Sequence, residues 1–152
     1  MPATATTHRL LLADDDVHVR DAIASVFRME GMDVTTAADG GEALYALRTE
    51  PRPCLILLDL DMPGMDGWEF RRRQLLWPAM ATIPVVVVSG QPEVKVAARA
   101  LEARAVLAKP VKVDCLLRVV DGHCAHAGPE AGARRLRLAR THAQTSASAS
   151  RN

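Results

Sequence analysis

Residues 55–67 read LILLDLDMPGMDG, an apolar run that ends at an aspartate and continues into a loop containing further aspartates and glycine. Four consecutive large aliphatic residues, Leu55 to Leu58, are typical of a strand that is covered on both faces of a parallel sheet. The leucines at 10–12 and the valines at 85–88 have the same character. These runs therefore predict the central strands of an α/β domain.

Short apolar runs alternate along the chain with stretches of helical periodicity, which predicts parallel strands joined by crossover helices. The runs cover 9–13, 33–37, 54–58, 84–88 and 105–108. Asp39 and Asp66 each precede a glutamate by three residues, a pattern that resembles a capping box and predicts helices opening at about Gly40 and Gly67. Other helices are expected before Gly31, over 92–101 and over 113–124. Five β-α units would then close one domain near His123.

The charge distribution separates this domain from a tail. The chain of 152 residues has a formal charge of +1, but residues 125–152 hold five arginines and one glutamate within a low-complexity sequence. We expect that tail to be mostly disordered, because it has few large apolar side chains to offset the entropy of ordering. A near-neutral chain also argues against nucleic-acid binding as the main function. The run Arg71 to Arg73 is interpreted as a solvated helix face.

The cysteines and the hydropathy indicate a cellular setting. Cys54, Cys115 and Cys124 are odd in number and lack metal-ligand spacing, so we expect thiols that act as small core side chains in a reducing compartment. The segment before Ala13 does not resemble a secretory signal, and no window approaches the ~18 apolar residues needed to cross a bilayer. The sequence predicts a cytoplasmic protein without a membrane partner.

Polar residues gather where the predicted strands end. Asp14 and Asp15 follow the first run, Asp59 the third, Ser89 the fourth and Lys109 the fifth. The carboxyl ends of parallel strands meet at one edge of the sheet, where open α/β sheets bind their ligands. One aspartate at a strand end is more often a loop cap, but this combination favours a functional site.

The chemistry of these side chains points to phosphoryl transfer. Carboxylates repel by about 4 kcal/mol at ~4 Å and an effective dielectric constant near 20, so a divalent cation would relieve an acidic cluster. Mg²⁺ prefers oxygen ligands and often shares them with a phosphate, and a lysine adds a positive charge for an anionic oxygen. Asp59 ends the most central run and is the best candidate nucleophile, since carboxylates can form acyl phosphates.

The sequence resembles the chemotaxis-type receiver domain of bacterial two-component response regulators over about residues 8–124. The matching segments are LLLADDD at the first strand, LILLDLDMPGMDG at the third, PVVVVSG at the fourth and LAKP at the fifth. The resemblance implies a flavodoxin-like, doubly wound sheet of five parallel strands in the order 2-1-3-4-5, with five helices. It also implies a cis peptide bond before Pro110.

Roles for the site residues follow from the same resemblance. Asp59 looks like the phosphoacceptor, which takes a phosphoryl group from a histidine kinase or phosphotransfer protein. Asp15 looks like a direct Mg²⁺ ligand and Asp14 like a ligand through water. Mg²⁺ would also contact Asp59 and the backbone carbonyl of Asp61.

Ser89 and Lys109 would bind phosphoryl oxygens, and signalling would pass to a protein partner through the surface formed by 92–101, 105–108 and 113–124. The family often has an aromatic residue where this chain has Val106, so coupling to that surface would be weaker here or would pass through backbone shifts. Such a protein would not be an enzyme beyond phosphorylation and dephosphorylation of its own aspartate. It would be a stand-alone receiver, since 152 residues leave little room for an effector domain.

Two alternatives stay open. The Asp59-Leu60-Asp61 segment also resembles the Asp-x-Asp motif of haloacid dehalogenase-type phosphohydrolases, although the other acids lie upstream rather than downstream of it. In the second alternative, the chain is a receiver whose basic tail binds nucleic acid.

Overall fold

The computed structural model describes residues 8–91 and 94–124, and the predicted disordered tail over 125–152 lies outside them. Strands and helices alternate throughout the described residues. In chain order they are β1 (Arg9–Ala13), α1 (Val17–Met29), β2 (Asp33–Ala37), α2 (Gly40–Thr49), β3 (Leu55–Asp59), α3 (Gly67–Leu76), β4 (Val85–Ser89), α4 (Val94–Ala100), β5 (Ala105–Ala108) and α5 (Val113–Cys124).

The strands form a single parallel sheet in the order β2-β1-β3-β4-β5. The predicted fold class and strand order are therefore confirmed. Two predicted strands end one residue later than expected, because Asp59 pairs with Val88 and Ser89 pairs with Ala108. Both polar residues are the last members of their strands rather than the first loop residues, which places them firmly at the sheet edge.

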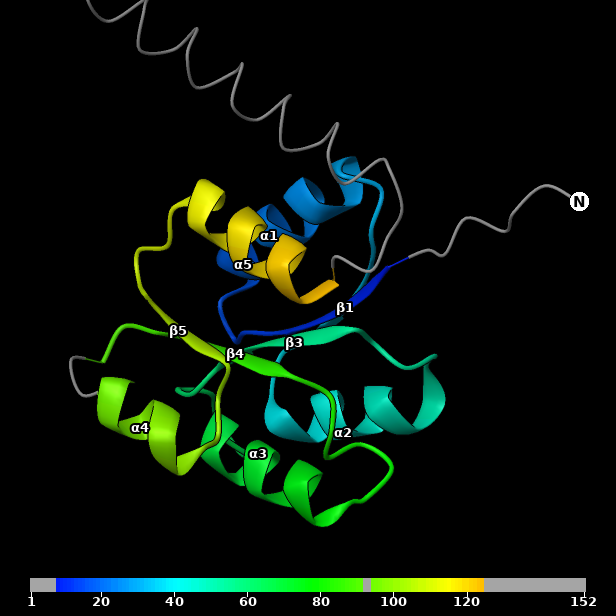
Figure 1. Ribbon diagram of the computed structural model, residues 1–152, viewed down its shortest axis with the longest axis vertical. Coiled ribbons are helices and arrows are strands. Elements are labelled where there is room, and N and C mark those ends of the chain that lie inside the picture. Colours follow the sequence, from blue (N-terminus) through cyan, green and yellow to red (C-terminus); the bar gives the residue numbers. More distant parts are fainter. Residues whose placement is uncertain (1–7, 92–93, 125–152) are drawn as a thin grey trace, which may run out of the picture.

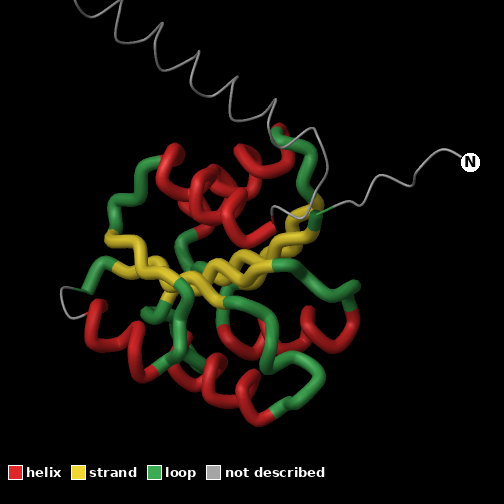
Figure 2. The backbone as a smooth tube through the Cα atoms, in the orientation of Figure 1, coloured by secondary structure: helices red, strands yellow, loops and turns green. Residues whose placement is uncertain are grey.

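Helices cover both faces of the sheet. Figures 1 and 2 show α1 and α5 on one face and α2, α3 and α4 on the other. The period of two along the strands divides the core accordingly. Leu10, Leu12 and Leu57 pack with Phe27 of α1 and with α5, whereas Leu11 and Leu58 pack on the other face. The continuous apolar runs thus mark strands that are buried on both faces.

The helices predicted to open at Gly40 and Gly67 do begin there, but neither start is a full capping box, because Glu42 accepts from the amide of Ala38 rather than from that of Asp39. Asp39 and Asp66 accept hydrogen bonds from the amides of Glu42 and Glu69, at 2.8 and 2.9 Å. Glu69, however, forms ion pairs with Arg72 and Arg73. Glu69 therefore forms ion pairs on the surface of α3 instead of completing a capping box.

The cysteine prediction is wrong for two of the three residues. Cys54, which directly precedes β3, forms a disulfide with Cys124 at the end of α5, and Cys115 is free. Spacing along the sequence could not show the pairing, because the two cysteines are 70 residues apart and meet only when α5 lies across the sheet.

The interpretation of the arginine run is wrong for Arg71. Arg72 and Arg73 are exposed, but Arg71 is 4% exposed. Its guanidinium donates hydrogen bonds to the carbonyl oxygens of Leu101 (2.8 Å) and Glu102 (3.1 Å), beyond the end of α4. These acceptors compensate for the burial, which lowers the pKa of the guanidinium.

The Arg71 side chain also connects to a second buried polar residue. It donates to the amide oxygen of Gln74 at 2.8 Å, and the Gln74 amide nitrogen donates to the carbonyl oxygens of Met80 and Ile83. Gln74 is fully buried. The two side chains thereby join α3 to the end of α4 and to the segment that enters β4.

Replacement of Arg71 by Met should destabilise the domain by about 2–4 kcal/mol, because buried carbonyl groups lose their donors. Arg72→Met is the matched control, since the exposed Arg72 should contribute at most about 1 kcal/mol. Urea unfolding of both variants measures the difference. Equally small losses of unfolding free energy in the two variants would contradict a structural role for Arg71.

Candidate functional site

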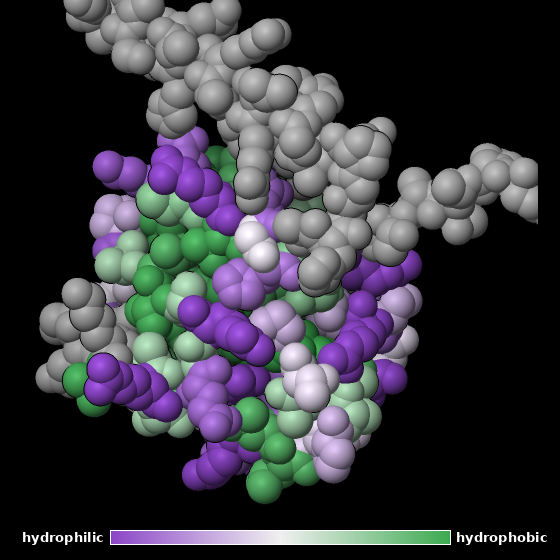
Figure 3. All heavy atoms as spheres, viewed as in Figure 1, coloured by the Kyte–Doolittle hydropathy of each residue, from purple (hydrophilic) through white to green (hydrophobic). Residues whose placement is uncertain are grey.

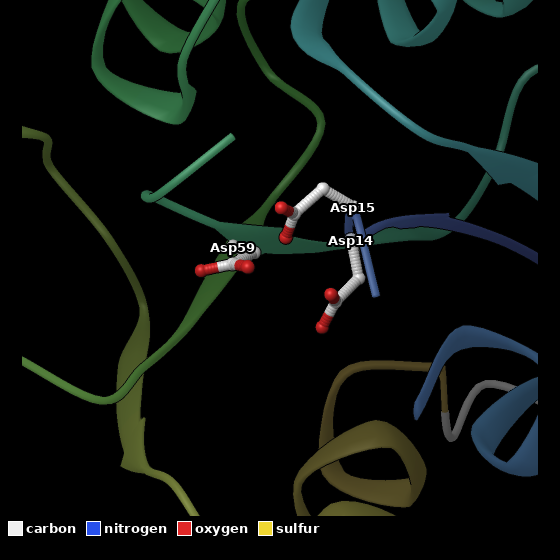
Figure 4. Close-up of side chains that lie close together, drawn as sticks. All are labelled: Asp14, Asp15 and Asp59. Atoms are coloured by element: carbon white, nitrogen blue, oxygen red, sulfur yellow. The ribbon is translucent and has the colours of Figure 1, made fainter. Parts of the chain in front are cut away.

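Three carboxylates converge at the carboxyl ends of β1 and β3. Oxygens from Asp14, Asp15 and Asp59 all lie within 4.8 Å of one another, and we call these residues the acidic cluster. Figure 4 shows Asp14 and Asp15 leaving the end of β1 beside Asp59 at the end of β3. Asp14 and Asp59 are buried, whereas Asp15 is exposed. The cluster is therefore held by the sheet and open to solvent at one residue.

Lys109 from the end of β5 completes the arrangement. Its Nζ lies 3.0 Å from Oδ2 of Asp14 and 3.1 Å from Oδ2 of Asp59. The Lys109 amide also donates to the carbonyl oxygen of Ser89 at 2.9 Å, and the following Lys109–Pro110 bond is cis, as predicted. One ammonium group thus bridges two buried carboxylates that approach from different strands.

The pKa values of Asp59 and Lys109 are both raised, but for different reasons. Burial raises the pKa of Asp59, against the opposing effects of the Asp61 amide and Lys109. Burial also disfavours the charged Lys109, but hydrogen bonds to Asp14 and Asp59 outweigh it and raise the Lys109 pKa. Lys109 is therefore held as a cation against an acidic cluster that it neutralises only in part.

Backbone amides orient the buried carboxylates. Asp16 N donates to Oδ1 of Asp14 at 2.9 Å, and Asp61 N donates to Oδ1 of Asp59 at 3.1 Å. Asp16 itself caps α1 by accepting from the amides of His18 and Val19, so its carboxylate serves the helix. Each buried aspartate therefore has one oxygen fixed by the backbone and the other facing Lys109.

Ser89 and Asp61 lie beside the cluster with other contacts. Ser89 is fully buried, and its Oγ accepts a hydrogen bond from the Gln91 amide at 3.2 Å. The Asp61 side chain is exposed in the loop after β3. Among the predicted site residues, Asp14, Asp15, Asp59 and Lys109 are thus brought together, whereas the roles of the Ser89 hydroxyl and the Asp61 carbonyl stay predictions.

Two residues that support the site were not found by sequence reasoning. Arg20 of α1 donates from Nη1 to the carbonyl oxygen of Asp14 at 2.8 Å, a contact from within the helix that no motif indicates. Gly67 begins α3 against the end of β3, and its amide donates to the Leu60 carbonyl oxygen at 3.1 Å. A Cβ at Gly67 would lie 2.3 Å from the Asp59 carbonyl oxygen. The DG pair in the motif indicated a helix start but not this contact.

The donor set fits a hard divalent cation. Carboxylate oxygens are the ligands that Mg²⁺ prefers, and three of them with one ammonium leave a net charge of −2 when all are ionised. A cation at this position would relieve the repulsion that the lysine leaves. The exposed Asp15 leaves this position accessible from solvent.

The family of the chain is shown by sequence. The response regulator receiver domain matches residues 10–121. This chain belongs to that family. As a receiver domain it is a signalling module of two-component systems.

Curated relatives share this part of the chain. The alkaline phosphatase synthesis transcriptional regulatory protein SphR of Synechococcus elongatus is 34% identical over 98 residues, 59% of this chain and 37% of the relative. The DNA-binding response regulator MtrA of Mycobacterium tuberculosis is 39% identical over 83 residues, 55% of this chain and 35% of the relative. The chain thus spans about a third of the length of these relatives.

Solved receiver structures have the same fold. The chemotaxis protein CheY4 of Vibrio cholerae has a TM-score of 0.71 at 28% identity, covering 77% of this chain and 98% of its own. A response regulator receiver protein from Pseudomonas putida has a TM-score of 0.72 at 28% identity, covering 78% and 98%. In the receiver described here, no helix among residues 8–91 and 94–124 has the length and apolar character needed to span a membrane.

Substitution of Gly67 by Ala should destabilise the receiver by about 1–3 kcal/mol, because the added methyl group collides with the backbone of Asp59. Gly122→Ala is the matched control. Gly122 lies within α5, and a methyl group added there would meet nothing within 4 Å beyond its chain neighbours and the backbone of its own helix, so this change should raise stability by up to about 1 kcal/mol. Urea unfolding distinguishes the two, and a neutral Gly67→Ala would show that the close approach is not required.

Proposed function

We propose that this receiver accepts a phosphoryl group on Asp59 from a phosphohistidine of a sensor histidine kinase or phosphotransfer protein, and then signals through protein contacts. The observation that carries the proposal is the bridge from Lys109 to both Asp14 and Asp59. It sets a carboxylate nucleophile beside a fixed positive charge at an accessible sheet edge. Such positioning and charge neutralisation are what phosphoryl transfer requires.

In this mechanism an Asp59 carboxylate oxygen attacks phosphorus while the phosphorus–nitrogen bond of the donor breaks. The Asp61 amide holds Oδ1 of Asp59 and so fixes the plane of the carboxylate before attack. Lys109 exchanges its hydrogen bond with Asp59 for one with a phosphoryl oxygen. Ser89, buried at the end of β4, donates its hydroxyl to another phosphoryl oxygen.

Asp14, Asp15, Asp59 and the backbone carbonyl of Asp61 would hold Mg²⁺. When bound, the ion supplies positive charge that neutralises the phosphoryl oxygens during transfer. Asp14 stays ion-paired with Lys109 and is fixed by the Asp16 amide, so it suits an indirect contact through water. Asp15 is exposed and suits direct ligation.

The output face, which we define as α4, β5 and α5, is the proposed contact surface for the downstream protein. Figure 3 shows apolar side chains beside hydrophilic ones on the side of the molecule where α5 and β5 lie. Val113 is 46% exposed, and β5 is less buried than β3 and β4. Val106 is half-buried and packs against the core, so switching would involve backbone movement rather than rotation of an aromatic ring.

We place the protein in the cytoplasm, where it would act without a membrane partner and without enzymatic activity beyond the chemistry of its own aspartate. The DNA binding named for MtrA is not carried over, because this chain matches only 35% of that relative. Within the given sequence, the basic segment 125–152 is the candidate for a nucleic-acid role. Deleting that segment and comparing salt-dependent DNA binding would test it.

Asp59→Asn should abolish labelling by acetyl phosphate with Mg²⁺, because the amide is not a nucleophile. Asp61→Asn is the matched control two residues away, and its labelling should persist, since only its backbone is assigned a role. Intact-protein mass spectrometry, which detects the added phosphoryl mass, measures both. A variant Asp59→Asn that is still labelled would contradict the assignment. If the native chain hydrolysed a phosphate ester and Asp61→Asn lost that hydrolysis, the haloacid dehalogenase-type alternative would be favoured.

Asp15→Asn should weaken Mg²⁺ binding by on the order of 10-fold or more, because a direct ligand should contribute at least as much as outer-shell groups do. Asp16→Asn is its control, since asparagine caps a helix as well as aspartate does. Calorimetric titration with Mg²⁺ alone measures the affinities. Equal affinities in the two variants would exclude Asp15 from the metal site.

A further inference from the structure

The disulfide between Cys54 and Cys124 lies at the amino-terminal edge of the sheet, opposite the acidic cluster. Cys54 directly precedes β3, which ends at Asp59, and Cys124 is the last residue of α5. Their Cα atoms are 5.8 Å apart, within the usual range for bridged cysteines. The bond therefore fixes the far end of a helix that begins four residues after Lys109.

We propose that Cys54 and Cys124 form a reversible redox modification site, oxidised to a disulfide by a small-molecule disulfide and returned to two thiols by the corresponding thiol. The proposal rests on the proposed function in one respect, the cytoplasmic setting. Disulfides that form in a reducing compartment are usually transient and redox-sensing rather than permanent. In such a compartment, the bond between Cys54 and Cys124 would thus form or break with the redox state of the surrounding small-molecule thiols.

The surroundings accommodate the reduced form as well. Sγ of Cys54 lies 3.0 Å from the carbonyl oxygen of Arg9, which can accept a hydrogen bond from a thiol S–H. The Cys54 amide already donates to the same carbonyl at 2.8 Å, so β1 holds this residue without the bond to Cys124. Cys124 is 8% exposed and packs in the core with Leu116, Leu117 and Val120. Reduction therefore leaves the fold in place and removes only the covalent tether.

Oxidation of Cys54 and Cys124 would proceed by two successive thiol–disulfide exchange steps. A cysteine thiolate attacks one sulfur of the small-molecule disulfide, which forms a mixed disulfide and expels one thiolate. The second cysteine, as thiolate, then attacks the protein sulfur of the mixed disulfide and expels the other thiolate. The protein loses two electrons and two protons, and the oxidant becomes two thiols. Half-buried Cys54 is the more accessible partner for the first step.

The modification changes the freedom of α5 rather than the chemistry of Asp59. Because the cysteines are 70 residues apart, the bond restricts the unfolded chain strongly and should stabilise the oxidised receiver. In the folded protein it joins the last turn of α5 to the start of β3. Since α5 belongs to the output face, the redox state would control how far this helix can move on partner binding.

The first test counts free thiols in the full chain equilibrated in glutathione buffers of stepped reduced-to-oxidised ratio. Alkylation followed by mass spectrometry should find three reactive cysteines under reducing conditions and one under oxidising conditions, with full reversal on return. Cys115→Ser is the matched control and should go from two to none. Absence of the bond at every ratio, persistence of the bond in the reducing buffers, or a bond that involves Cys115 would each overturn the proposal.

The second test compares the two states of the same protein. Oxidation should raise the melting temperature by on the order of 10 °C and slow amide exchange in the last turn of α5. The Cys54→Ser/Cys124→Ser variant should show neither change between buffers. Identical amide exchange in α5 in both states of the native chain would overturn the claim that the bond controls this helix.

Labelling of Asp59 by acetyl phosphate in these samples separates the two proposals. We expect equal labelling in both redox states, because the cysteines lie at the opposite edge of the sheet. Reversible bonding without any labelling would contradict the proposed function and leave the redox site standing. Normal labelling without reversible bonding would overturn the redox site alone.

Discussion

The ion-pair bridge from Lys109 to Asp14 and Asp59 is the interaction on which the organisation of the sheet edge depends. Two buried carboxylates from neighbouring strands would repel each other, and one ammonium from β5 allows both to stay close. The bridge also joins the ends of β1, β3 and β5. Lys109 neutralises the cluster only in part, and the remaining negative charge is the basis for the proposed binding of a cation and, with it, a phosphoryl group.

Periodicity and strand-end chemistry predicted the architecture and the acidic cluster, because both arise from local rules. A continuous run such as Leu55 to Leu58 is explained only by burial on two faces, and parallel strands deliver their following residues to one edge. Arg20, Gly67 and Arg71 were missed or misinterpreted because their roles depend on contacts with backbone atoms of other elements. Those contacts have no periodicity and no residue-type signal.

The pairing of Cys54 with Cys124 is likewise a long-range contact that local sequence patterns do not show. Cys54 and Cys124 each have a sufficient local explanation as a small apolar side chain, since Cys124 belongs to the core and half-buried Cys54 packs against it. Their pairing follows only from the topology, which brings the start of β3 next to the end of the last helix. Long-range proximity of this kind needs the complete path of the chain, whereas a motif needs only its own neighbours.

The buried Arg71 recognises the end of α4 through main-chain carbonyl oxygens rather than through side chains. A contact with backbone atoms does not depend strongly on which residues supply them. Glu102 supplies its carbonyl oxygen to the guanidinium, and its exposed side chain adds only a nearby negative charge. Related receivers could diversify such exposed positions during evolution, and so acquire different binding partners, while the backbone that presents them keeps one shape.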